Sequence, residues 1–145
     1  MQKITSLAAL SGKAKYFMSD RDHSRYMLEL AEKDLAALKG MLDVNVFADE
    51  IFGFHAQQAV EKSFKSWISY LEEEYPLIHD LSVLLSKLAN HDCDVSDLWD
   101  LVELNAFAVQ FRYESFESTE EPLDRQDLIK KVQHLFDKVK AIIET

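Results

Sequence analysis

The sequence predicts an all-α protein, an up-and-down antiparallel bundle of four to five helices. The chain of 145 residues has only three glycines and two prolines, which leaves little material for tight hairpins, and 48% of its residues are apolar. Apolar residues also recur at helical spacing in several separate stretches. The length suits one domain that buries a real core.

The N-terminal part of the chain divides into an extension and a first helix. Residues 1–19 have no sustained period and are expected to be partly ordered at best, ahead of a helical bundle domain at residues 20–145. The first helix is expected to begin near His23 and to end near Gly40. Its apolar positions recur near i, i+4 spacing: Tyr26, Leu30, Leu35, Leu38 and Leu42.

The stretch from Phe52 to Leu71 is predicted to form one long helix with a broad apolar stripe that faces the core. The members of that stripe are Phe52, Ala56, Ala59, Val60, Ser63, Phe64, Trp67 and Leu71. A flank of the same helix is polar and carries His55, Gln58, Glu61, Lys62 and Lys65. These amide, imidazole and ammonium groups can hold a nucleotide or a partner. The alternative is an exposed helix face with i, i+4 pairs.

A third helix is predicted to start at Leu81, because Pro76 disfavours helix in the residue before it and four leucines then form a stripe. Asp80 stands directly before that stripe and is well placed as its N-cap. We therefore interpret His79 and Asp80 as cap and structural residues. An acid/base dyad is the alternative, but adjacent residues rarely converge on one substrate atom.

The fourth predicted helix, from about Asp97 to Tyr113, is apolar nearly all round. Such a helix is buried on most sides or gives one face to a partner, and Trp67 and Trp99 are expected to be core anchors. A last helix is predicted from Leu123 to about Ile143. Its lysines are interpreted as a solvated face.

Asn105 and Arg112 are seven residues apart and share one stripe of the fourth predicted helix. Arg112 can clamp a phosphate through two hydrogen bonds, or it can pair with Glu61 or another acidic residue. Asn105 can line the same site or form a hydrogen bond across a helix interface. The sequence leaves these alternatives open.

Charge and composition restrict the partners. The net charge of −10 repels a phosphate backbone at long range, so nucleic acid is not the expected partner. The single Cys93 cannot form an internal disulfide, and no histidine has metal-ligand spacing, so neither a metal nor a cofactor is expected. The chain has no apolar run of about 20 residues. A cytoplasmic location is the expectation.

Three motifs occur in one order: FHAQQAVEKSFKSW, then His79-Asp80-Leu81, then Arg112-Tyr113. With them the chain resembles the HEPN family, small all-helical proteins of prokaryotes, from about His23 to Ile143. The resemblance implies a four-to-five-helix bundle that commonly dimerises. RNA-cleaving members carry Arg, four to six residues, then His. Here positions 117 to 119 hold Glu-Ser-Thr.

The ribonuclease site of the family therefore cannot be carried over. The chain looks like the branch with an RY-type ending, which implies binding of a nucleotide or of a minimal nucleotidyltransferase partner without catalysis, with a toxin–antitoxin-type system as one setting. The implied ligand-binding residues are His55, Gln58, Glu61, Lys62, Lys65, Asn105, Arg112 and Tyr113. Two alternatives stay open: a divergent metal-independent endoribonuclease that uses His55 or His79 as base, and a purely structural dimerisation module.

Overall fold

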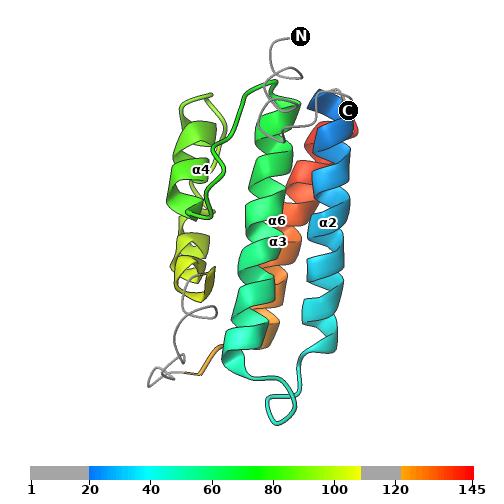
Figure 1. Cartoon of the computed structure of the whole chain (residues 1–145), viewed down its shortest axis with the longest axis vertical. Coiled ribbons are helices and arrows are strands. Elements are labelled where there is room, and N and C mark those ends of the chain that lie inside the picture. The colour runs from blue at the N-terminus through cyan, green and yellow to red at the C-terminus, as the bar shows by residue number, and fades with distance from the viewer. Residues whose placement is uncertain (1–19, 109–121) are drawn as a thin grey trace.

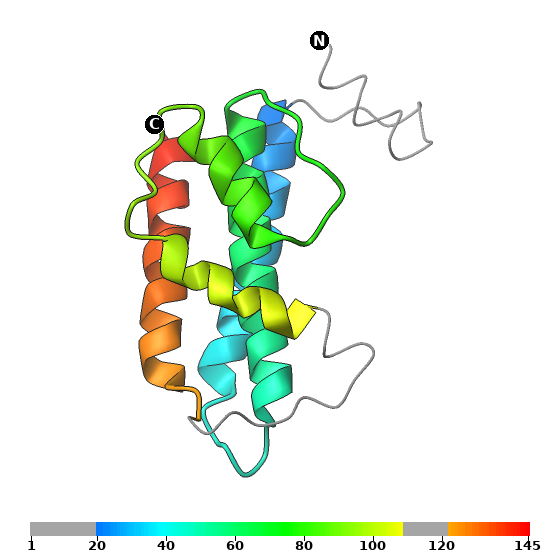
Figure 2. The same ribbon diagram turned by 90° about the vertical axis from the view of Figure 1, so that its left-hand side faces the viewer.

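The computed structural model describes residues 20–108 and 122–145. In these ranges the chain forms α2 (Asp20–Gly40), α3 (Asp49–Tyr70), α4 (Leu81–Ala89), the 3₁₀ helix η1 (Trp99–Leu104) and α6 (Arg125–Ile143). The predicted all-α bundle is confirmed. α2 and α3 form an antiparallel pair, and α6 packs beside both and runs in the same direction as α3 (Figure 1). α4 and η1 cover another side of α3, and η1 runs across the long helices (Figure 2).

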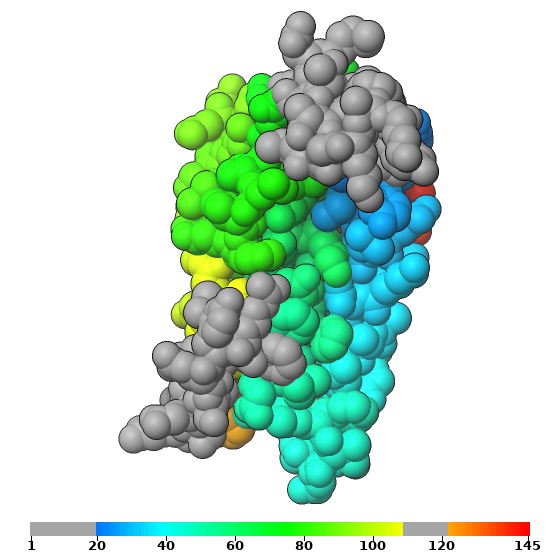
Figure 3. All heavy atoms as spheres, viewed as in Figure 1, coloured from blue at the N-terminus to red at the C-terminus, as the bar shows by residue number. Residues whose placement is uncertain are grey.

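The central helix α3 contacts every other helix of the described chain. Its predicted apolar stripe is confirmed, since Phe52, Ala56, Val60 and Phe64 are completely buried. On the face seen in Figure 3, α2 and α3 lie side by side along the molecule. This position between neighbours also buries part of the polar flank of α3, including Glu61 and Lys65.

Helix α2 packs on α3 through a different stripe from the one its large apolar residues predict. Leu35 and Leu38 are buried as expected, but Tyr26 and Leu42 are exposed. The buried stripe includes the small side chains of Ser24 and Ala31 beside three leucines, and these small residues allow a close approach to α3. Ser24 Oγ donates to Ser66 O, and Ser66 Oγ donates to Ser24 O, both at 2.7 Å. A pattern of large apolar residues misses the small and polar members of such a stripe.

The start of α4 agrees with the prediction. Asp80 is the N-cap, and its Oδ1 accepts a hydrogen bond of 2.9 Å from the backbone N–H of Ser82. The four leucines of the predicted stripe are completely buried: Leu81, Leu84, Leu85 and Leu88. The predicted cap role of Asp80 is therefore confirmed.

The predicted fourth α-helix is wrong up to residue 104, where the chain forms the 3₁₀ helix η1, whereas residues 105–108 are α-helical as predicted. A 3₁₀ helix has three residues per turn, and the buried side chains follow that spacing: Leu98, Leu101, Leu104 and Phe107. Trp99 points away from this side and is 43% exposed, whereas Trp67 is 3% exposed. The predicted anchor role is confirmed for Trp67 and wrong for Trp99. Residues 109–113 lie outside the described residues.

Helix α6 closes the core from the other side of α3. Asp124 caps its N-terminus by accepting a hydrogen bond from the backbone N–H of Asp127 at 3.0 Å. Its buried face consists of Val132, Leu135, Phe136, Val139 and Ile143, together with Arg125. No helix in the described ranges combines the length and the apolar character needed to cross a membrane.

Gly53 lets the ring of Phe107 lie directly against α3. A Cβ atom at position 53 would overlap the Phe107 ring, and the buried ring has little room to move. We expect Gly53→Ala to destabilise the protein by about 1–3 kcal/mol, although alanine favours helix by about 1 kcal/mol. Urea unfolding measures this, and adding Phe107→Leu should recover part of the loss. Unchanged stability in Gly53→Ala would contradict the close contact.

Candidate functional site

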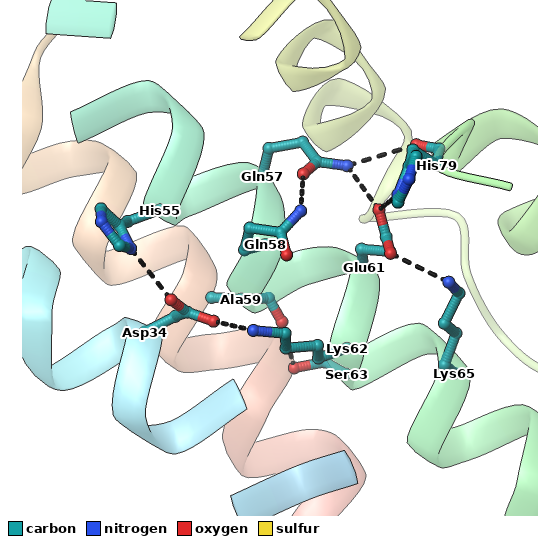
Figure 4. A network of polar contacts seen from close by, with 10 residues as sticks. All are labelled: Asp34, His55, Gln57, Gln58, Ala59, Glu61, Lys62, Ser63, Lys65 and His79. Carbon is teal, nitrogen blue, oxygen red and sulfur yellow. Dashed lines mark hydrogen bonds and ion pairs between the residues drawn. The ribbon is translucent and has the colours of Figure 1, made fainter. Parts of the chain in front are cut away.

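Two carboxylates, those of Glu61 and Asp34, lie at the centre of the polar flank of α3. Each of them interacts with two or more other side chains (Figure 4). Glu61 lies on α3 itself, and its side chain is 5% exposed. Asp34 lies on α2 and faces α3. Because a buried carboxylate is costly without partners, the contacts of these two groups determine what the flank can do.

Glu61 is fully engaged by three neighbours. Its Oε1 accepts hydrogen bonds of 2.9 Å from Gln57 Nε2 and from His79 Nδ1, and its Oε2 forms an ion pair of 2.9 Å with Lys65 Nζ. Burial alone would raise the pKa of Glu61, but the hydrogen bonds from Gln57, Lys65 and His79 and the charge of Lys65 outweigh it. The pKa of Glu61 therefore lies below its ordinary value.

Asp34 joins two partly exposed members of the flank, His55 and Lys62. Its Oδ1 accepts from His55 Nδ1 at 2.9 Å, and its Oδ2 pairs with Lys62 Nζ at 2.6 Å. Gln58 lies between the Asp34 and Glu61 groups, and its Nε2 donates to Gln57 Oε1 at 2.7 Å (Figure 4). The result is one row of fixed imidazole, amide and ammonium groups along α3.

The network continues from Lys65 to the first turns of α2. Lys65 Nζ lies 5.2 Å from the centre of the Tyr75 ring, and the Tyr75 hydroxyl and His23 Nε2 share a hydrogen bond of 2.6 Å. Burial, followed by the charge of Glu61, raises the pKa of Tyr75 to about 12. Burial lowers the pKa of His23. The connection between α3 and α4 is thus attached to both α2 and α3.

A hollow of about 610 Å³ opens at the start of α4, beside the Glu61 group. Its lining residues are Leu77, Ile78, His79, Asp80, Asn105 and Ala108. Asn105 joins the two sides of the hollow, because its Oδ1 accepts from the backbone N–H of Leu81 at 2.8 Å and its Nδ2 donates to Asp80 Oδ1 at 2.9 Å. This is the helix-interface hydrogen bond that was one of the two alternatives for Asn105.

The structure divides the predicted ligand-binding residues into groups. His55, Gln58 and Lys62 come together on the accessible part of the flank, whereas Glu61 and Lys65 are buried and satisfy each other. Arg112 and Tyr113 lie outside the described residues, so their predicted contacts stay predictions.

Two members of the network are not among the predicted site residues. Asp34 comes from another helix, and no spacing in the sequence connects it to His55 and Lys62. Gln57 is completely buried, and the signal for it was its i, i+4 spacing to Glu61.

The fold and the site define a class: a helical-bundle protein whose central helix carries a network of fixed polar side chains. A family model described as the HEPN domain matches residues 24–142. The chain belongs to the HEPN family, as the sequence motifs predict. Searches of curated proteins and of solved structures gave no match.

Acid should destabilise the folded protein, because it protonates the Glu61 carboxylate. A carboxyl group whose pKa is lower in the folded chain adds stability above its unfolded pKa, and that stability is lost as the pH falls through the folded value. The ordinary pKa is 4.5, so we expect the Glu61 contribution to be complete above that pH, to decrease as the pH falls below it, and to be lost only below the lower pKa of the folded chain. Urea unfolding between pH 7 and pH 3 should show a flatter acid limb in Glu61→Gln. The exposed Glu103→Gln should keep the wild-type slope, and equal slopes in all three proteins would contradict the prediction.

Proposed function

We propose that this HEPN protein binds a nucleotide, a minimal nucleotidyltransferase partner, or both, at the polar flank of α3 and without catalysis of its own. The observation that supports this is the fixed geometry of His55, Gln58 and Lys62, each held by a side chain of the same network. Groups that are already ordered lose little entropy when a ligand binds. A cytoplasmic location and a toxin–antitoxin setting are part of the same proposal.

Lys62 is the first phosphate contact in this proposal. Its ammonium group has three donors, and the hydrogen bond to Asp34 uses one of them. Arg112 is the second phosphate contact, and His55 and Gln58 orient the base or the ribose. Lys65 takes no part, because its ammonium group is buried against Glu61.

Three features favour binding over RNA cleavage. The family's catalytic histidine is replaced by Glu-Ser-Thr at positions 117 to 119. His55, one candidate for a substitute base, shares Asp34 with the Lys62 ammonium group. His79, the other candidate, stands next to Asp80, whose negative charge repels a phosphodiester.

Calorimetric titration with ATP and GTP tests the nucleotide part. We expect wild-type protein to bind at least one of them, and Lys62→Ala and Arg112→Ala to bind about tenfold more weakly, which corresponds to about 1.4 kcal/mol. Lys130→Ala, an exposed lysine on α6, is the matched control and should bind like wild type. No binding of either nucleotide, or equal binding by all variants, would reject this part.

Purification from the native host tests the partner part. A nucleotidyltransferase that elutes with the protein supports it, and the protein alone rejects it. The homodimer belongs to the same proposal and is supported by the exposed Trp99 ring. Sedimentation should show a dimer, and Trp99→Arg should shift it to monomer. A monomeric wild-type protein would reject the dimer.

A further inference from the structure

The hollow at the start of α4 differs in chemistry from the polar flank of α3. We propose that it binds the guanidinium group of an arginine side chain from a partner protein, and that it excludes phosphate. The proposal does not depend on nucleotide binding at Lys62, so either can hold without the other. It rests on the donors and acceptors that line the hollow.

The N-terminus of α4 has no free donors for an anion. The backbone N–H of Leu81 donates to Asn105 Oδ1 at 2.8 Å, and the N–H of Ser82 donates to Asp80 Oδ1 at 2.9 Å. The N–H of Val83 also interacts with the Asp80 carboxylate. A helix N-terminus normally attracts anions through such groups. Here the chain's own carboxylate already occupies that position.

In its neutral form, His79 presents an acceptor. Its Nδ1 faces Glu61 Oε1 at 2.9 Å, and a carboxylate can only accept, so this contact assigns the proton of the neutral imidazole to Nδ1. Nε2 is then an acceptor, on a side chain that is 47% exposed. Glu61 is a positioning residue in this arrangement, because it fixes the ring without touching the ligand.

Asp80 supplies the negative charge. Hydrogen bonds from Ser82, together with one from Asn105, hold the pKa of Asp80 below its ordinary value, so the group stays ionised. Its Oδ1 is occupied by Ser82 N, Ser82 Oγ and Asn105 Nδ2. The second N–H of the Asn105 amide is a single donor beside a carboxylate and an imidazole acceptor. The polar rim therefore suits a ligand that donates.

The remaining walls suit a flat group. Leu77, Ile78 and Ala108 are apolar, and Leu77 is 68% exposed. A guanidinium ion is planar, weakly hydrated on its faces and rich in donors at its edge. An ammonium ion lacks the faces, and a phosphate lacks the donors. The net charge of −10 also favours approach of a cation over an anion.

The test is a titration of the full chain with N-acetyl-L-arginine amide, followed by NMR shifts of residues 77–80. We expect saturable shifts there with a dissociation constant on the order of 1–10 mM, and about tenfold weaker binding in Asp80→Asn. Asparagine is also a good N-cap, so this variant should stay folded. Asp94→Asn is the matched control, because Asp94 makes the same contacts to Ser96 outside the hollow and should leave binding unchanged.

Other probes separate this proposal from its competitors. We expect N-acetyl-L-lysine amide, inorganic phosphate and guanosine each to shift residues 77–80 much less than the arginine probe does. Stronger binding by any of them, or equal binding by Asp80→Asn, would overturn the proposal. His79→Ala should also weaken arginine binding, which keeps the test decisive if Asp80→Asn folds poorly. Nucleotide binding at Lys62 should be unchanged in Asp80→Asn.

Discussion

Replacing Lys65 by methionine is expected to destabilise the protein by about 3–5 kcal/mol. The ion pair between Lys65 and Glu61 is buried, with side chains that are 9% and 5% exposed. Methionine has a similar volume but no charge, so the Glu61 carboxylate would stay in the interior with only the hydrogen bonds from Gln57 and His79. A buried charge without its partner lowers the stability of the protein by more than the intact ion pair adds to it. Urea unfolding followed by circular dichroism measures the loss.

A double variant distinguishes an unpaired charge from lost packing. Glu61→Gln together with Lys65→Met removes both charges, and we expect it to recover most of the stability that Lys65→Met loses. Lys131→Met is the control, because Lys131 makes an exposed i, i+4 pair with Asp127 and should cost less than about 1 kcal/mol. A loss of that small size in Lys65→Met would contradict the buried pair.

The long helices could be predicted because their periods are regular. The stripe from Phe52 to Trp67 and the four leucines of α4 each occupy one side of an ideal α-helix, and burial follows from that geometry. The buried face of α2 was harder to predict, since it includes the polar Ser24, which packs on α3 through two hydrogen bonds with Ser66. The first part of the fourth element was predicted wrongly because the buried residues of η1 repeat every three positions, which an α-helical period cannot represent.

The candidate site could be predicted only in part. The spacing of Gln57, Glu61 and Lys65 is visible in the sequence, but their burial depends on His79 and on the connection that carries it. Asp34 belongs to another helix, so the pairing that fixes His55 follows only from the packing of α2 on α3. A single helix shows which polar groups share a flank, and the neighbours decide which of them stay accessible to a ligand.

Arg125→Ala is expected to cost about 3–5 kcal/mol and to loosen one end of the bundle. Arg125 is 5% exposed, although nothing in its spacing marks it as a core residue. Its Nη1 donates to Met41 O at 2.7 Å, and its Nη2 donates to Phe47 O at 2.6 Å and to Asp49 Oδ1 at 2.8 Å. The guanidinium carbon also lies 5.0 Å from the centre of the Phe52 ring. Alanine would leave all three acceptors without this donor.

The segment that loosens in Arg125→Ala tests the role of Arg125 as well as the loss of stability does. Hydrogen exchange should speed up in residues 41–49, which join α2 to α3, before it changes in α4. Arg125→Lys keeps the charge but not the two-pronged geometry, so it should recover only part of the stability. Arg25→Ala removes an exposed arginine paired with Asp22 and should change the free energy of unfolding by less than about 1 kcal/mol. Exchange in residues 41–49 of Arg125→Ala that stays as slow as in wild type would contradict this role. It would show that other contacts hold the connection without the hydrogen bonds from Arg125 to the carbonyl groups of Met41 and Phe47.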